Sequence, residues 1–397
     1  MQSRRSFLAV PAAFAFSGSV DWPQWRGPNR DGLAPPERSE AWPEKLRKLW
    51  SVPVGEGHSS PVVLGDRVFQ FTRLQDQEVL AAYHLQTGKA LWKQSYAAPY
   101  TMNSAATAHG KGPKATPVIG GPRIYTAGIA GMLTAWDAAS GSKVWQHDSK
   151  GSPDFGLASS PVLDRGTLVA AIGPQQGGSL TAFDAATGKI KWQWKEDGPA
   201  YASPVVIEPQ GVRQVVTNSQ SHLVSVALSD GKLLWKLPLK TPYDQNSVTP
   251  TVVGDLLVYS GLSNPVTAIR PGSPPQKVWE NKELGMYMNS PVLAAGVLWG
   301  LSHRNKGQFF GLDPQTGKTV WTGEGRQAEN AGMIARGDRI FALTTNSELQ
   351  LFHAKPKSLE LQRTYQVADS PTWAHPVVLG PRVLVKDLNT LALWSAE

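Results

Sequence analysis

The sequence contains no cysteine among its 397 residues. Disulfides, thiolate metal sites, cysteine nucleophiles and a lipid-modified N-terminal cysteine are therefore excluded. Charged residues make up only 18% of the chain, and the net charge of +8 is spread along it without a lysine or arginine block. Because no nucleic-acid-binding motif accompanies this charge, we expect no nucleic-acid partner.

Long hydrophobic runs are also scarce. The apolar run from Phe7 to Phe16 is about half the ~20 residues that a membrane-spanning helix needs. It follows the pair Arg4-Arg5 and precedes the small residues Ser17-Gly18-Ser19, which is the order of a twin-arginine export signal. We therefore predict a signal peptide over residues 1–20 and a periplasmic or extracellular protein with neither a membrane span nor a lipid anchor.

Motifs for common catalytic chemistry are missing too. The sequence has no Gly-x-Ser-x-Gly and no His-Glu-x-x-His, and its eight histidines show no tight metal-ligand spacing. We therefore expect no metal site. A set made of His58, His375 and Glu329 is a weaker alternative.

Glycine (38), proline (31) and tryptophan (15) are abundant and recur in register. A small or polar residue followed by proline opens a hydrophobic strand every 41 to 56 residues, and an Ala-Gly pair fills one slot. Proline suits the first position of a strand, where its missing N–H is harmless. The repeated positions are Pro61, Pro117, Pro161, Pro204, Pro250, Pro291, Gly332 and Pro376.

A second marker runs in phase with the first. A turn such as Asp184-Ala185-Ala186-Thr187-Gly188-Lys189 joins two short strands, and the second strand carries Trp192. Asp bonds the amides of such a turn, and Gly adopts its left-handed position without steric cost. The strand tryptophans are expected to lie between neighbouring units: Trp50, Trp92, Trp145, Trp192, Trp235, Trp279 and Trp321.

Four-stranded units of this length are typical of propeller blades, and the sequence contains eight. The last unit, from Ser370 to Trp394, stops after three strands, whereas Lys48 to Val52 resembles the missing fourth strand. We therefore predict an all-β, eight-bladed propeller over residues 46–397, in which the N-terminal strand completes the last blade. Residues 21–45 form an N-terminal arm ahead of it.

With its repeated turn and tryptophan, the chain resembles the quinoprotein-like propellers. These include dehydrogenases that carry pyrroloquinoline quinone (PQQ) and BamB-type propellers that serve outer-membrane protein assembly. The segment from Asp21 to Gly32 looks like the N-terminal arm of exported PQQ-like repeat proteins. The resemblance implies PQQ with Ca²⁺ as a cofactor, or an envelope protein as a partner. The cysteine pair of the dehydrogenases and the cysteine anchor of the assembly factors are both absent.

In a propeller, the connectors between blades surround the mouth of the central channel. The connector residues three positions before each strand opening should therefore ring that mouth, and His375 joins them. Consecutive blades place polar groups on one arc, with Glu329 and Asn330, then Trp373 and His375, then His58, then Lys114. The rest of the ring is Ala158, Tyr201, Ser247 and Met288, and Asn289 adjoins it. Such convergent groups predict a binding pocket.

Further candidate residues lie in loops of the same face. The longest connector, Ser95 to Lys114, and the loop with His303, Arg304 and Lys306 should place cations at the rim. These favour a small anionic ligand, and PQQ, a tricarboxylate, is one example. Asp244 and Asp369 are the candidates for a general base.

Three functions follow. The first is an exported propeller that binds a small anionic ligand or a protein partner at the channel mouth, without evident catalysis. The alternatives are a PQQ-dependent oxidoreductase, with the quinone over Trp373, and an envelope scaffold for protein assembly.

Overall fold

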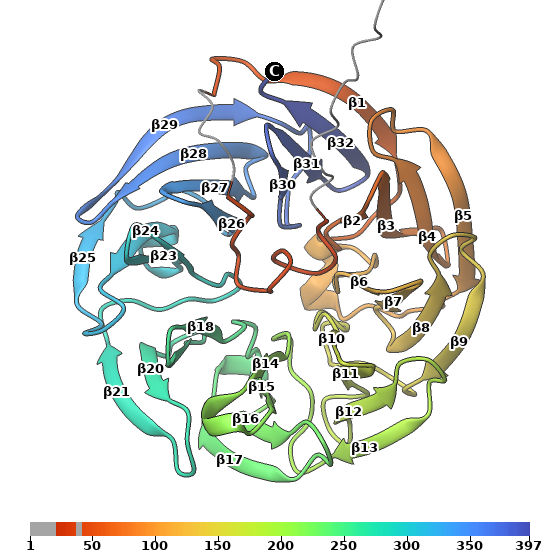
Figure 1. Ribbon diagram of the computed structural model, residues 1–397, viewed down its shortest axis with the longest axis horizontal. Coiled ribbons are helices and arrows are strands. Elements are labelled where there is room, and N and C mark those ends of the chain that lie inside the picture. The colour runs from red at the N-terminus through yellow and green to blue at the C-terminus, as the bar shows by residue number, and fades with distance from the viewer. Residues whose placement is uncertain (1–20, 37–41) are drawn as a thin grey trace, which may run out of the picture.

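The computed structural model describes residues 21–36 and 42–397, and the signal predicted for residues 1–20 lies outside this range. The chain forms eight four-stranded antiparallel sheets arranged as blades around a central channel (Figure 1). The predicted eight-bladed propeller is confirmed. Within the described ranges, no helix is long and apolar enough to cross a membrane.

The first four blades follow one another along the chain. Their strands are β2 (Val62–Leu64), β3 (Arg67–Leu74), β4 (Gln77–His84), β5 (Ala90–Ala97); β6 (Val118–Gly120), β7 (Arg123–Ala127), β8 (Met132–Asp137), β9 (Lys143–Asp148); β10 (Val162–Asp164), β11 (Thr167–Ile172), β12 (Ser179–Asp184), β13 (Ile190–Trp194); and β14 (Val205–Ile207), β15 (Gln214–Asn218), β16 (His222–Ala227), β17 (Leu233–Pro238).

The last four blades complete the ring. Their strands are β18 (Thr251–Val253), β19 (Leu256–Tyr259), β20 (Val266–Arg270), β21 (Gln276–Asn281); β22 (Val292–Ala294), β23 (Val297–Ser302), β24 (Gln308–Leu312), β25 (Thr319–Thr322); β26 (Ala331–Arg336), β27 (Arg339–Thr344), β28 (Glu348–Lys355), β29 (Ser358–Gln366); and β30 (Val377–Leu379), β31 (Arg382–Lys386), β32 (Thr390–Ser395) with β1 (Arg47–Pro53). Four short 3-10 helices lie in connectors and loops: η1 (Ser104–His109), η2 (Pro209–Gly211), η3 (Pro242–Asp244) and η4 (Arg304–Lys306).

The ring closes as predicted. Strand β1 pairs antiparallel with β32, from Arg47 opposite Ser395 to Pro53 opposite Thr390. The outermost strand of blade 8 thus comes from the other end of the propeller sequence. Closure leaves no blade without a neighbour, so the apolar faces of the first and last blades are covered by each other.

The strand tryptophans connect neighbouring blades. The indole N–H of Trp50 donates to the Leu85 carbonyl of the next blade at 2.8 Å, and Trp192 donates to Leu228 at 2.9 Å. A Cβ on the glycine of the next blade's turn would lie within 3 Å of the indole, as at Gly88 beside Trp50. The turn therefore requires glycine both for its left-handed φ and for the close approach of the ring.

A one-residue β-bulge lies directly before each of these seven tryptophans. In blade 3, for example, Ala182 pairs with Trp192 and Phe183 pairs with Ile190, so the intervening residue has no partner. The same shift occurs in all seven strands. A bulge turns the strand locally and redirects its side chains. It also explains why Leu91 and Val144, the bulged residues of blades 1 and 2, are exposed although they are apolar.

The residues before the strand-opening prolines form a second set of links, around the channel. Each backbone N–H at this position donates to the hydroxyl of the next blade, at 2.8–3.1 Å, from blade 8 to blade 5. The members are His375, Ser60, Thr116, Ser160, Ser203 and Thr249. The repeated Ser/Thr-Pro pair therefore joins blades as well as opening strands.

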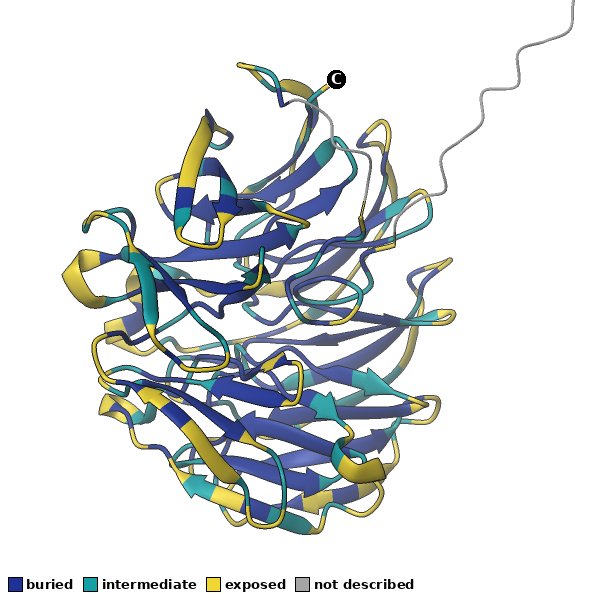
Figure 2. Ribbon diagram, turned by 60° about the vertical axis from the view of Figure 1, so that its left-hand side comes forward, coloured by how far each residue is buried: buried dark blue, intermediate teal, exposed yellow. Residues whose placement is uncertain are grey.

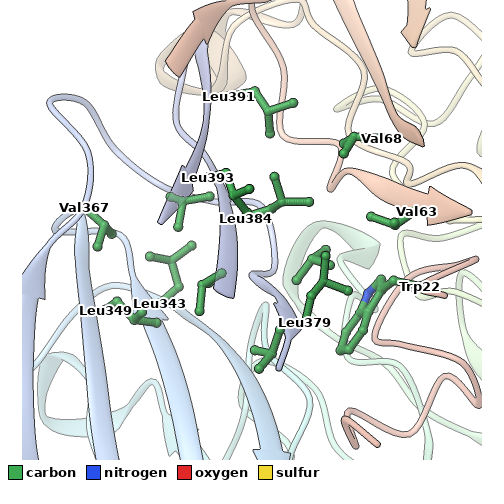
Figure 3. Close-up of a cluster of buried hydrophobic side chains, with 14 of the residues drawn as sticks. Trp22, Val63, Val68, Leu343, Leu349, Val367, Leu379, Leu384, Leu391 and Leu393 are labelled. Atoms are coloured by element: carbon green, nitrogen blue, oxygen red, sulfur yellow. The ribbon is translucent and has the colours of Figure 1, made fainter. Parts of the chain in front are cut away.

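Apolar residues fill the space between blades, whereas the outer strands are largely exposed, as the blue and yellow ribbons in Figure 2 show. Figure 3 shows the largest cluster, where Trp22 of the arm lies beside Val63 and Leu379. Trp22 is 1% exposed and exchanges two backbone hydrogen bonds with Val63, both 2.9 Å long. The arm is thus packed into the propeller.

Candidate functional site

A cavity of about 520 Å³ opens at the connector end of the central channel. Its floor is the hydroxyl ring and Trp25 of the arm, and its walls are connector residues. The lining consists of Trp25, His58, Ser60, Ala105, Ala106, His109, Lys114, Thr116, Phe155, Ala158, Ser160, Tyr201, Ser203, Tyr243, Gln245, Ser247, Thr249, Tyr287, Met288, Asn330, Trp373 and His375.

One wall carries the predicted polar arc. His58, Lys114, Asn330, Trp373 and His375 all line the cavity, although they come from four blades. The long connector adds η1, whose His109 meets Trp373 edge-on with ring centroids 4.7 Å apart. The His58 ring lies 5.8 Å from Trp373 and 5.9 Å from His109, so the three rings form one cluster.

The opposite wall is more aromatic than the sequence indicated. Four residues of the predicted ring line this wall: Ala158, Tyr201, Ser247 and Met288. The Tyr201 hydroxyl accepts a hydrogen bond from the Phe155 N–H at 3.3 Å. The Tyr287 hydroxyl donates to the side-chain oxygen of Gln245. This wall therefore adds the rings of Phe155, Tyr201 and Tyr287 to the lining.

Two members of the predicted arc and ring lie elsewhere. Glu329 is exposed and does not line the cavity, although it approaches Tyr287 closely enough to contribute to the raised pKa of that phenol, after burial. Asn289 is buried beside the ring and donates to the Leu301 carbonyl at 2.9 Å. The alternative metal set with Glu329 does not assemble, and no cluster of three or more potential ligands occurs in the described chain.

The predicted rim cations lie outside the cavity lining. The Nδ1 atom of His303 lies 3.0 Å from the Gly285 carbonyl. The Arg304 guanidinium donates to the carbonyls of Lys282 and Glu283, both at 2.7 Å, and Lys306 is exposed. His303 and Arg304 thus hold η4 against the preceding connector, and none of the three side chains lines the cavity.

The two candidate general bases also lie outside the lining. Asp244, on η3, accepts a hydrogen bond from the Gln220 amide at 2.8 Å. Asp369 is exposed in the connector before blade 8. Tyr243, which precedes Asp244 on η3, does line the cavity and is 79% exposed.

Several lining residues had no role in the sequence-based site. Phe155, Tyr243, Gln245 and Tyr287 lie in connectors but outside the position chosen for the ring. The sequence does contain a signal for the aromatic members of this group, because most connectors carry an aromatic residue. Trp25 lies more than thirty residues from the first connector position, and only the fold brings it to the floor.

The electrostatic character of the cavity is positive. Among the described residues that line it, none is Asp or Glu. The Lys114 ammonium donates to the Phe155 carbonyl at 2.7 Å, and burial lowers its pKa to about 8. It is therefore protonated at neutral pH, and two of its three N–H donors remain for a ligand.

Two histidines that line the cavity are held neutral. Burial, together with the charges of His109, Lys114 and Lys386, lowers the pKa of His58 to about 3, although a hydrogen bond with the His109 backbone opposes this. Burial and the nearby Arg26 charge lower the pKa of His375 to about 3. His58 Nε2 and His375 Nδ1 are buried without a hydrogen-bond partner in the described chain.

These shifts predict loss of stability in acid. The pKa of each ring is about 3 in the folded protein and near 6.5 when unfolded, so the unfolded chain binds more protons between these values. The contribution of the two neutral histidines to stability is fully present above pH 6.5. As the pH drops from 6.5 toward 3, the free energy of unfolding should fall by about 1.4 kcal/mol per pH unit for each histidine. Urea unfolding at pH 7 and pH 5 measures this loss. The His58→Gln/His375→Gln double variant should show a smaller loss, and an unchanged loss would contradict the assignment.

The donor set also tests whether a PQQ–Ca²⁺ pair fits. Calcium takes six to eight oxygen ligands, usually with carboxylates among them. The described lining offers hydroxyl groups and the amide side chains of Gln245 and Asn330, and the Gln245 oxygen already accepts from Tyr287. The Ca²⁺ partner therefore does not fit this cavity, whereas the flat, anionic ring system alone matches its aromatic walls and its lysine.

Blades joined by docked tryptophans, a closing N-terminal strand and a cavity at the channel mouth define a PQQ-like β-propeller. A family model described as outer membrane protein assembly factor BamB matches residues 75–323. The chain belongs to this family.

Individual relatives agree with this. The outer membrane protein assembly factor BamB of Yersinia pestis is 25% identical over 256 residues, which are 58% of this chain and 64% of that protein. The match therefore spans less than two thirds of the relative. The structure of BamB from Moraxella catarrhalis has a TM-score of 0.65 at 14% identity, covering 88% of this chain and 97% of that one.

The fold is shared equally with enzymes. The quinohemoprotein alcohol dehydrogenase ADHIIG of Pseudomonas putida HK5 has a TM-score of 0.71 at 13% identity, covering 95% of this chain and 80% of that one. At these identities the solved structures establish the fold alone, and the function has to be inferred from the residues of the site.

Proposed function

We propose that this chain is an exported propeller that binds a small, flat anionic ligand in the cavity at the channel mouth. The observation that supports this most is the lining itself. It combines the protonated Lys114 with six aromatic side chains, and among its described residues there is no carboxylate. A site that only held water would gain nothing from this exclusion of negative charge.

Each wall has a part in the proposed binding. Lys114 supplies a charge-assisted hydrogen bond to the anion, which is stronger than a neutral one. The Trp373 indole and the facing tyrosines hold the flat part of the ligand by stacking. The hydroxyls of the floor already accept backbone N–H groups, so each has its own proton left to donate to the ligand.

The residues of this arrangement favour binding over catalysis. Asp244 and Asp369, the candidate bases, lie outside the lining. The Ca²⁺ partner of the quinone lacks carboxylate ligands there. The proposal is therefore binding, and the oxidoreductase alternative needs a base and a metal site that this cavity does not offer.

The family favours a second candidate, an envelope role with a protein partner. Its described function is outer-membrane protein assembly, and the predicted signal over residues 1–20 would deliver this chain to the same compartment. The partner would bind the exposed loops of the blades, so the two candidates use different surfaces and can be tested separately. Crosslinking of the exported protein in intact cells tests this candidate.

Titration of the purified protein with PQQ, with and without Ca²⁺, tests the ligand proposal. Binding to the native state alone must raise the melting temperature, because it shifts the unfolding equilibrium by mass action. We expect PQQ to raise the melting temperature without Ca²⁺. Lys114→Ala removes a charged hydrogen bond, so it should lower the affinity for PQQ about 10- to 100-fold.

Lys111→Ala is the matched control, because Lys111 is an exposed lysine of the same connector that does not line the cavity. It should bind PQQ as the wild type does. An absence of stabilisation at saturating PQQ would reject binding of this class of ligand. A strict requirement for Ca²⁺ would instead favour the oxidoreductase alternative.

A further inference from the structure

The N-terminal arm crosses the centre of the ring, as the red segment in Figure 1 shows. Backbone hydrogen bonds fix it to the innermost strands of three blades. Trp22 pairs with Val63, Pro23 accepts from Ile119 at 2.8 Å, and Ala34 donates to Ala335 at 2.8 Å. The arm thus closes the channel on the side away from the cavity mouth, and Trp25 forms part of the cavity floor.

Two arginines of the arm are buried in the channel. Arg30 donates to the carbonyls of Ser160 at 2.8 Å and Pro161 at 2.9 Å. Arg26 donates to the Pro291 carbonyl and, at 3.3 Å, to that of Asp31. Their partners are thus mainly backbone carbonyls.

Among the described residues, no ion pair neutralises the charges of these arginines. Within the described chain, neither guanidinium lies within 4.0 Å of a carboxylate oxygen. Burial lowers the pKa of Arg26 to about 10, and the nearby Asp31 opposes that shift; burial and the Arg26 charge lower the pKa of Arg30 to about 9. Both therefore stay positive at neutral pH, although isolated buried charges are costly.

The Trp25 ring, which lines the cavity, lies close to both of these charges. The Arg26 and Arg30 guanidinium carbons lie 5.5 Å and 5.8 Å from the centroid of that ring. The ring also meets His375 edge-on at 5.2 Å. Two positive charges therefore stand directly behind the floor, in a region of low dielectric where their field is weakly screened.

We propose that the arm makes the cavity selective for anions: Trp25 is the surface on which the ligand rests, and Arg26 and Arg30 supply the field that attracts its negative charge. This inference rests on the proposed binding function and extends it to a segment outside the blades. It also explains why arginine occupies positions 26 and 30, although a neutral side chain could donate hydrogen bonds to the same carbonyls.

Two fluorescent probes of one shape separate charge from stacking. The anion 8-anilinonaphthalene-1-sulfonate and the neutral N-phenyl-1-naphthylamine share their ring system and differ by the sulfonate. We expect the wild type to bind the anion more tightly than the neutral probe. The affinity ratio is the affinity for the anionic probe divided by that for the neutral probe. Arg30→Gln keeps a donor for the carbonyls and removes the charge, and it should lower this ratio about tenfold.

Arg30→Lys is the matched control, because it keeps the charge and loses the planar fork of donors. The wild-type ratio should persist in Arg30→Lys. Arg26→Gln should behave as Arg30→Gln does, and it keeps the test decisive if one variant fails to fold. Circular dichroism and melting curves identify the folded variants.

The outcomes separate the two proposals. An unchanged ratio in the folded glutamine variants would overturn the role of the arm and leave the cavity proposal intact. A ratio lowered equally by lysine and by glutamine would also overturn it, because the arginines would then act only by shaping the floor. Binding of neither probe to the wild type would contradict the cavity proposal and, with it, this one.

Discussion

Replacing Trp50 by alanine should lower the free energy of unfolding by about 3–5 kcal/mol, as expected when a large buried aromatic residue is removed. Trp50 is 9% exposed, and its indole donates to the Leu85 carbonyl of blade 1 at 2.8 Å. It also lies on β1, the strand that closes the ring. The substitution therefore creates a cavity, leaves a carbonyl without its donor and weakens the closing strand. Urea unfolding of the wild type and the variant measures the loss.

Trp321→Ala is the matched control. Trp321 occupies the equivalent strand position in blade 6, but blade 7 lacks the Asp-Thr-Gly turn that should receive it. It is half-buried and meets Trp299 of its own blade edge-on at 5.9 Å. Its removal should cost clearly less than that of Trp50. Equal losses would show that docking between blades contributes little to stability.

Replacing Gly188 by alanine should destabilise the protein by about 2–4 kcal/mol. Gly188 has a φ of +72°, and a Cβ there would lie 2.7 Å from the Trp145 indole. The variant therefore combines left-handed strain of about 1 kcal/mol with overpacking that typically costs about 1–3 kcal/mol.

Gly166→Ala in the same blade separates the two contributions. Gly166 has a φ of +77°, but a Cβ there would meet no atom within 4 Å. It should show the strain alone, about 1 kcal/mol. If both variants lost the same stability in urea unfolding, the close approach of tryptophan to the turn would not constrain the fold.

The architecture followed from the sequence because the repeat is local. Seven of the eight blades contain their own strand-opening proline, and most blades carry a glycine turn, so Asp184 to Trp192 could be interpreted without knowing its neighbours. The missing fourth strand of blade 8 was found by the likeness of Lys48 to Val52 to the other copies. The bulge before each tryptophan was not predicted, because it depends on register between strands and leaves no composition signal.

The site was predicted less completely. A rule based on position placed His58, Lys114 and Trp373 at the channel mouth, because the propeller geometry repeats. The rule could not give side-chain direction, so Glu329 was included although it points to solvent and lies outside the lining. The arm was identified as a segment, but the burial of Arg26 and Arg30 depends on carbonyls more than a hundred residues away.

Calorimetric titration of PQQ into the wild type and into Lys114→Ala, in Ca²⁺-free buffer, tests the central claim most directly. The claim is that an aromatic cavity with one half-buried lysine, and without a carboxylate in its described lining, binds a flat anion at the channel mouth. The account predicts saturable binding to the wild type at a single site and an affinity about 10- to 100-fold lower for the variant. No binding heat for the wild type, or equal affinities for both proteins, would contradict it.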